Sequence, residues 1–371
     1  MTDRKGPYPL TMHMAKAMGD DFMHADQGGK MKSERFIAGV KKYQAHPYKR
    51  NIERNNVIWR ENGSRIFHLP AKQTGDEQAR ASVLLIPSLI NKSDILDLMP
   101  EQSFFAWLAA QGVDAYLLDW GRITAQTDLQ TVDQIAAHLH AAIHAAKQHA
   151  ASCSDASFTC LGYCMGGTLL AGILAGAQGS ALCDKAVFLA APWDFAPENH
   201  ALSTEITRGK AAAYQLMSER KMLSADWIQN CFFAVSQDKA VEKFIAFADM
   251  EPDSDEARRF VAVEDWLNDG LDLPEPIARM CIDDWYGRNK PFQGQWVVND
   301  TPVRAENITV PSFVVASSVD RLVPFHAAQG LHVQIADSEI IDTATGHVGM
   351  MAGRKSVSRV WQPIFDWICQ K

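Results

Sequence analysis

Leu161-Gly162-Tyr163-Cys164-Met165-Gly166-Gly167 is the stretch that decides the expected fold of this chain. It has the pattern glycine, any residue, nucleophile, any residue, glycine, in which the glycines let a strand turn sharply into a helix. Such a turn displays its central side chain, here Cys164, above the carboxyl end of a parallel sheet. At a helix N-terminus, unpaired backbone N–H groups and the helix dipole favour the thiolate form. The pattern therefore predicts a nucleophilic cysteine.

A core position is the alternative for Cys164, because free cysteines often pack as small hydrophobic residues. A core cysteine does not need a glycine on each side, so Gly162 and Gly166 favour the nucleophile. Cys160 lies four residues earlier on the expected strand, and we expect it in the core rather than as a redox partner.

Short apolar runs bounded by turn residues predict the strands of one sheet around this turn. The runs are 81–87, 115–119, 157–163, 185–190, 312–317 and 338–343, and an antiparallel pair, 56–59 and 64–69, is expected before them. Helical stretches intervene at 102–111, 131–150, 165–177, 324–332 and 355–370. This alternation predicts an α/β fold with a doubly wound, mostly parallel sheet and right-handed crossovers.

The alternation stops between about residues 196 and 304, where helical sequence rich in tryptophan and methionine takes over. This segment, which contains Trp227, Trp266, Trp285 and Trp296, is too long for a loop. We interpret residues 196–304 as an inserted, mainly helical cap or lid over the carboxyl ends of the strands. Residues 55–195 and 305–371 then form the core, and residues 1–54 are expected to form peripheral helices.

An activated cysteine needs a base, and the base needs a group that orients it. In folds with this turn, an acid follows a late strand and a histidine follows the next one. Asp320 directly follows the run 312–318, and His347 follows the next run, between Gly346 and Val348. A turn or helix cap is the alternative role for Asp320, and core packing is the alternative for His347. The order predicts an α/β-hydrolase fold with Cys164, Asp320 and His347 as its catalytic triad.

Two backbone N–H groups should form an oxyanion hole beside the triad. One is expected from Met165, the residue after the nucleophile, and the other from the loop after the run 81–87. In that loop, Leu89 or Ile90 is the expected donor.

Composition and charge argue against nucleic acid as the main partner and against a membrane-spanning segment. The chain has 36 basic and 44 acidic residues, a net charge of −8 and no basic block, which argues against nucleic acid. An anionic substrate would need a local basic pocket. The longest apolar stretches are well short of the ~20 residues that a spanning helix requires, so no transmembrane segment is expected.

The seven cysteines are odd in number and lack paired zinc spacing, and no apolar segment occupies the N-terminus, which predicts a reduced, cytoplasmic protein. His140 and His144 share a helix face at a spacing that could hold a metal. No third ligand is indicated, so a solvated polar face is the preferred interpretation. We expect neither a metal nor a cofactor.

A cysteine nucleophile also narrows the substrate. Moving an acyl group from one thiol to another is nearly thermoneutral, whereas loading a thiol from an oxygen ester is uphill. The sequence therefore favours an acyl thioester donor such as acyl-CoA.

Seven motifs, taken in order along the chain, resemble those of polyhydroxyalkanoate synthases, especially the short catalytic subunits of classes III and IV. Leu161 to Thr168 is similar to the cysteine-containing lipase-like box of that family. The other motifs are Leu89-Ile90-Asn91-Lys92 with Leu96-Asp97-Leu98, Tyr116 to Gly121, Pro192 to Phe195, Trp266 to Gly270, Asp320 to Pro324, and Gly346 to Gly349. The likeness covers residues 55 to 370.

This resemblance implies polymerisation of (R)-3-hydroxyacyl-CoA, with 3-hydroxybutyryl-CoA as the expected monomer. It implies that Cys164 carries the acyl chain as a thioester, that His347 deprotonates it, and that Asp320 helps to activate the incoming 3-hydroxyl group. CoA then enters only as part of the substrate. A polyester granule surface, a homodimer and a second synthase subunit are the further partners that the resemblance suggests.

Two positions depart from the family pattern. Arg321 stands where histidine usually follows the aspartate, and Asp94 stands where an aromatic residue is usual. These departures bear on monomer preference, partner contacts and polymerase activity. The alternatives are a cysteine-dependent acyl-CoA thioesterase or non-polymerising acyltransferase of the same fold, and a catalytically silent granule-binding relative.

Overall fold

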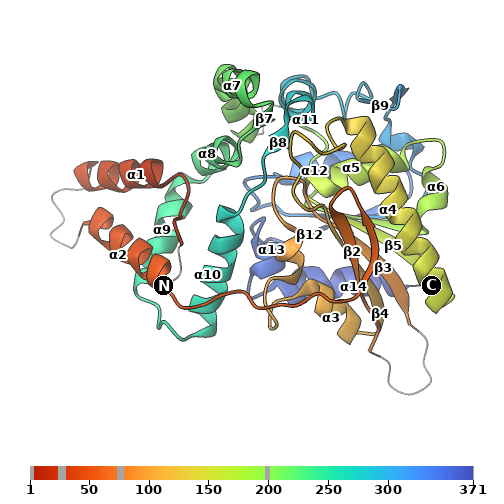
Figure 1. Cartoon of the computed structure of the whole chain (residues 1–371), viewed down its shortest axis with the longest axis horizontal. Helices are drawn as coiled ribbons and strands as arrows, with labels where there is room; N and C mark the ends of the chain where they lie inside the picture. Colours follow the sequence, from red (N-terminus) through yellow and green to blue (C-terminus); the bar gives the residue numbers. More distant parts are fainter. Residues whose placement is uncertain (1–3, 24–30, 73–78, 197–200, 371) are drawn as a thin grey trace.

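A mostly parallel sheet lies between helices on one side of the molecule, and α1 (Leu10–Met23), α2 (Lys32–Ala45) and α9 (Gln237–Ala248) lie on the other (Figure 1). The computed structural model describes residues 4–23, 31–72, 79–196 and 201–370. Within these ranges the largest sheet has eight strands in the order β1-β2-β4-β3-β5-β6-β11-β12. They are β1 (Val57–Glu61), β2 (Ser64–Leu69), β3 (Ala81–Ile86), β4 (Val113–Asp119), β5 (Phe158–Tyr163), β6 (Lys185–Leu189), β11 (Ser312–Ala316) and β12 (Ser338–Asp342).

Strand direction follows the sequence prediction. β1 pairs with β2 and β2 with β4 in antiparallel register, and all other neighbours are parallel. The predicted fold class, an α/β sheet that is mostly parallel, is therefore confirmed. β4 begins at Val113, two residues before the expected start, because Gly112 at φ +85° makes the turn that precedes it.

Helices cover both faces of the sheet, which explains the unbroken apolar runs of its central strands. In β3, Leu84 and Ile86 face the helices α4 (Val132–Cys153), α5 (Met165–Leu174) and α12 (Phe325–Gln334). Val83 and Leu85 face the opposite layer, formed by α3 (Phe104–Ala110), the π-helix η5 (Val357–Trp361) and α14 (Gln362–Cys369). The short helices α6 (Gly179–Leu182) and α13 (Gly349–Ala352) and the 3₁₀ turn η1 (Ser93–Asp97) complete these layers.

A mainly helical segment joins β6 to β11. It contains α7 (Ala201–Arg220), α8 (Ala225–Val235), α9 (Gln237–Ala248), α10 (Asp255–Asn268), α11 (Glu275–Arg279), the π-helix η3 (Met280–Gly287) and the 3₁₀ turn η4 (Ala305–Asn307). Two small antiparallel pairs lie between them, β7 (Met222–Leu223) with β8 (Leu273–Pro274) and β9 (Val297–Val298) with β10 (Thr301–Pro302). The limits proposed for core and cap stay a prediction.

The first two helices, α1 (Leu10–Met23) and α2 (Lys32–Ala45), pack on this helical segment rather than on the sheet (Figure 1). Phe36 and Tyr43 of α2 stack edge-on against Phe244 of α9. Gly39 permits this approach, because a Cβ there would lie 1.9 Å from the carbonyl oxygen of Phe244. The helices expected near the N-terminus thus buttress α9.

Candidate active site

Cys164 lies in a strained turn between β5 and α5. Its backbone has φ +56° and ψ −128°, a conformation that residues other than glycine rarely adopt. A Cβ at Gly162 would lie 2.4 Å from the Cα of Gly167, and a Cβ at Gly166 would lie 2.5 Å from the carbonyl oxygens of Ile86 and Pro87. Both flanking positions therefore require glycine, which is the physical reason for the sequence pattern.

Asp320 and His347 meet beside this turn, although 27 residues separate them. His347 Nδ1 lies 2.7 Å from Asp320 Oδ2. The other carboxylate oxygen accepts the backbone N–H groups of Leu322 at 2.8 Å and Val323 at 3.0 Å, so the Asp320 side chain is held in place and fully buried. Since Nδ1 contacts the carboxylate, Nε2 is the ring nitrogen available to Cys164.

Opposing effects set the protonation of His347. Burial lowers its pKa, but the charges of Asp320 and Cys164 and hydrogen bonds to both side chains raise it, and the result lies well above the ordinary value. These contributions place Cys164 within interaction range of the imidazole. The raised pKa favours the protonated imidazole of His347 beside Cys164.

Tyr163 is a residue of this site that the sequence reasoning missed. Its ring stacks on the His347 ring at 5.3 Å, with an angle of 26° between the planes. Its hydroxyl donates to the carbonyl oxygen of His347 at 3.3 Å. Burial, and then the charges of Cys164 and Asp320, raise the pKa of Tyr163 well above its usual range, so the phenol keeps its proton. An aromatic residue just before the nucleophile is the sequence signal for this support.

The expected oxyanion donors lie at the ends of β3 and β5. Among the described residues, no acceptor pairs with the backbone N–H of Met165 or of Leu89. The N–H of Ile90 instead donates to Ser88 Oγ at 3.3 Å. The N–H of Leu89 is therefore more available to a substrate than that of Ile90. The assignment of the oxyanion hole stays a prediction.

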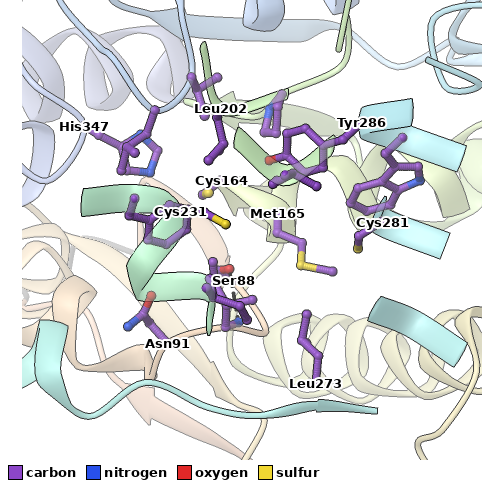
Figure 2. Close-up of a pocket in the computed structure, with 18 of the residues that line it drawn as sticks. Ser88, Asn91, Cys164, Met165, Leu202, Cys231, Leu273, Cys281, Tyr286 and His347 are labelled. Atoms are coloured by element: carbon purple, nitrogen blue, oxygen red, sulfur yellow. Dashed lines mark hydrogen bonds between the residues drawn. The ribbon is translucent and has the colours of Figure 1, made fainter. Parts of the chain in front are cut away.

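A pocket of about 110 Å³ opens beside Cys164 and is almost wholly apolar (Figure 2). Apolar side chains of α7, α8 and η3 line it, among them Leu202, Trp227 and Ile282. Three of the four tryptophans singled out in the helical segment, Trp227, Trp266 and Trp285, lie in its wall, whereas Trp296 packs behind Trp285.

Three cysteines and two tyrosines, Tyr163 and Tyr286, also line this pocket. Cys231 and Cys281 line the pocket together with Cys164. Burial raises the pKa of Cys231 and of Cys281 to about 12, so these two side chains stay neutral thiols. Tyr286, which the sequence reasoning did not identify, presents its hydroxyl on the side of Cys164 (Figure 2). Burial and then the charge of Cys164 raise the pKa of Tyr286 well above its usual range.

The remaining candidates from the sequence lie elsewhere. Cys160 is completely buried, which confirms its place in the core. In the part of the chain that the structure describes, no three His, Cys, Asp or Glu side chains, including those near His140 and His144, form a group that could hold a metal ion. No helix there is long and apolar enough to cross a membrane.

The two unusual positions have different surroundings. Asp94 pairs with Arg50 at 3.4 Å and with Arg54 at 3.0 Å, so its carboxylate belongs to a cluster of ion pairs. Arg321 is exposed on the turn that holds Asp320.

Comparison with known proteins finds relatives in the family that the motifs resemble. No family model matches the chain. A poly(3-hydroxyalkanoate) polymerase subunit PhaC from Haloferax mediterranei is 25% identical over 336 residues, which cover 85% of this chain and 64% of that protein. The same subunit from Allochromatium vinosum is 22% identical over 327 residues, 86% of this chain and 89% of the relative.

The alignment thus spans less than two thirds of the Haloferax protein but most of the shorter relative. Among solved structures, MenH from S. aureus superposes with a TM-score of 0.50 and 16% identity, covering 82% of this chain and 99% of that one. The protein has the α/β-hydrolase fold, and its similarity to several polymerase subunits along most of its length supports a place in the polyhydroxyalkanoate synthase family.

Proposed function

We propose that this protein is an acyltransferase that polymerises (R)-3-hydroxyacyl-CoA, with 3-hydroxybutyryl-CoA as the monomer, into polyester and releases CoA. The observation that carries the proposal is the Cys164 turn beside the 2.7 Å pair of His347 and Asp320. The polymerase relatives support the polyester product. The motif resemblance supports a class III or IV catalytic subunit.

Loading of the enzyme is the first chemical step. Cys164 attacks the thioester carbonyl after its proton passes to Nε2 of His347, and the buried Asp320 carboxylate stabilises the imidazolium. Negative charge develops on the carbonyl oxygen. The backbone N–H of Met165 and that of Leu89 or Ile90 donate hydrogen bonds to this oxygen and stabilise the charge. CoA leaves as its sulfur takes the proton back from His347. The acyl group is then a thioester on Cys164.

Chain growth is the second step. The 3-hydroxyl group of an incoming unit gives its proton to the pair formed by His347 and Asp320 and attacks the thioester on Cys164. An ester bond forms, and the cysteine thiolate leaves. The extended chain, which now ends in a CoA thioester, can load Cys164 again.

The chemistry of the pocket supports an alcohol rather than water as the acceptor. Its wall is apolar, with indole rings of Trp227, Trp266 and Trp285 around the thiol. A site that excludes water protects a thioester from hydrolysis while the hydroxyl of the next unit attacks.

Both steps are acyl transfers, so the proposed reaction uses no metal or cofactor besides the CoA of the substrate. We further propose that the protein acts in the cytoplasm at the surface of polyester granules. A homodimer, or a complex with a second synthase subunit, is the proposed assembly. The resemblance in motifs supports these three statements.

A product assay tests the proposal. Purified protein is incubated with (R)-3-hydroxybutyryl-CoA, and both released CoA and insoluble polyester are measured. We expect CoA and polymerised units in equal amounts. Free 3-hydroxybutyrate in place of polymer would instead identify a thioesterase. The Cys164→Ala protein should release no CoA, and release at the wild-type rate would exclude the cysteine mechanism.

A further inference from the structure

A basic groove of about 530 Å³ lies next to the Cys164 pocket. It opens at the carboxyl ends of β3 and β4, the edge of the sheet that carries Cys164. Five cationic side chains line it, together with Asp94 and Asp119; they are Arg50, Arg54, Arg65, Lys92 and Arg122. In a chain of net charge −8, so dense a basic surface indicates an anionic ligand.

One loop forms a wall of both cavities. Ser88, Ile90 and Asn91 line the Cys164 pocket, and the next residue, Lys92, lines the groove. Trp266, in the pocket wall, donates its indole N–H to the carbonyl oxygen of Lys92 at 2.8 Å. The loop of residues 88–92 therefore separates the groove from the Cys164 pocket.

Carboxylates of the protein pair with the cations but do not use all their donors. Arg50 and Arg54 contact Asp94 and Asp97, and Arg65 contacts Asp119 at 2.7 Å. Lys92 and Arg122 share Asp269.

Three buried guanidinium nitrogens in this group have no hydrogen-bond acceptor among the described residues: Nε of Arg50, Nη2 of Arg54 and Nε of Arg65. Nη2 of Arg54 has only an ion-pair contact, 3.0 Å from Asp94. Buried donors without an acceptor are unfavourable. An additional anion would offset this excess of donors and positive charge.

Phe67 fixes two of these arginines. The guanidinium groups of Arg54 and Arg65 lie 5.5 Å and 5.1 Å from the centre of its ring. Such contacts orient a guanidinium without neutralising its charge. Arg65 and Arg122 have side chains 41% and 68% exposed, so both can reach a ligand in solvent.

We propose that this groove binds the phosphate groups of CoA and so positions the acyl thioester for Cys164. The inference rests on the proposed function, because it requires an acyl-CoA substrate. Arginine is well suited to the role, since its planar group donates two hydrogen bonds to one phosphate. The groove then supplies the local basic site that an acidic protein needs for an anionic substrate.

Two thioesters of the same acyl group test the proposal. 3-Hydroxybutyryl-CoA carries phosphates, whereas its N-acetylcysteamine thioester has none. Arg65→Gln and Arg122→Gln should each raise KM for the CoA thioester about tenfold, the loss expected for a charge-assisted hydrogen bond, and leave KM for the other thioester unchanged. Arg208→Gln, on the exposed face of α7, is the matched control and should change neither.

Equal effects on both thioesters, or none, would overturn the proposal. So would a selective loss of CoA affinity in Arg321→Gln alone, because Arg321 is the exposed cation beside Asp320. Calorimetric titration of CoA into the Cys164→Ala protein measures the groove without turnover, and the two groove substitutions should weaken that binding about tenfold. If the two groove substitutions weaken CoA binding but neither thioester yields polymer, the proposed function is wrong and the proposal that the groove binds CoA is kept.

Discussion

Gly166→Ala should disable the site while leaving the protein folded. A Cβ at this position would lie 2.5 Å from two backbone oxygens at the end of β3, those of Ile86 and Pro87. Ordinary contact begins at 3.4 Å, so the first turn of α5 and the end of β3 must separate by about 0.9 Å. That shift moves Met165 relative to the loop that carries Leu89. Because a misplacement of ~1 Å can cost about 100-fold, we expect kcat to fall about 100-fold.

The same clash should cost about 1–3 kcal/mol of folding free energy, as overpacking of a core does. CoA release at saturating 3-hydroxybutyryl-CoA measures kcat, and urea unfolding measures stability. Gly349→Ala is the control, because no atom lies within 4 Å of a Cβ built there. If Gly166→Ala were folded and kept kcat within about threefold of wild type, the argument that this contact sets the oxyanion geometry would be refuted.

Three other predictions concern the groups around His347. Asp320→Asn removes the largest charge that raises the pKa of His347. Labelling of Cys164 by iodoacetamide at pH 7, followed by mass spectrometry, should therefore slow about tenfold. Undiminished labelling would show that the pair of Asp320 and His347 does not activate Cys164. Because the folded-state pKa of His347 lies above its ordinary value of about 6.5, its protonation stabilises the fold fully below that pH, and this contribution is lost as pH rises through the folded-state value. The stability difference between wild type and His347→Gln should therefore shrink as pH is raised from about 6.5, and a constant difference in urea titrations would disprove this. Tyr163→Phe removes one hydrogen bond but keeps the stacked ring, so it should cost about 1 kcal/mol of unfolding free energy with little change in kcat; a large fall in kcat would show that the hydroxyl takes part in the reaction.

The strands of this fold and the turn at Cys164 could be predicted from the sequence because their sequence signals are local. Runs of apolar residues between turn residues marked β3, β5, β6 and β11 to within a residue or two. The turn at Cys164 was identifiable because the steric demand at Gly162 and Gly166 lies within two residues of that cysteine. The order of Cys164, Asp320 and His347 followed from the order of strands, since parallel strands present their carboxyl ends at one edge.

Side chains that meet across the chain were beyond such reasoning. Three features depend on how separate segments pack: the stacking of Tyr163 on His347, the position of Tyr286 in the pocket wall, and the packing of α2 on α9.

The basic groove shows most clearly the difference between what the sequence predicts and what only tertiary packing decides. The sequence established that the chain is acidic and that Asp94 and Arg321 are unusual, but no run of basic residues signals the groove. Its cations come from the segment before β1, from β2 and from the loops after β3 and β4. The pairing of β2 with β4 and of β4 with β3 brings Arg65, Arg122 and Lys92 together. Ion pairs with Asp94 and Asp97 add Arg50 and Arg54. Sequence patterns determined the elements and the turn at Cys164, whereas tertiary packing decided which charges and rings surround that turn, because those contacts join residues far apart in the chain.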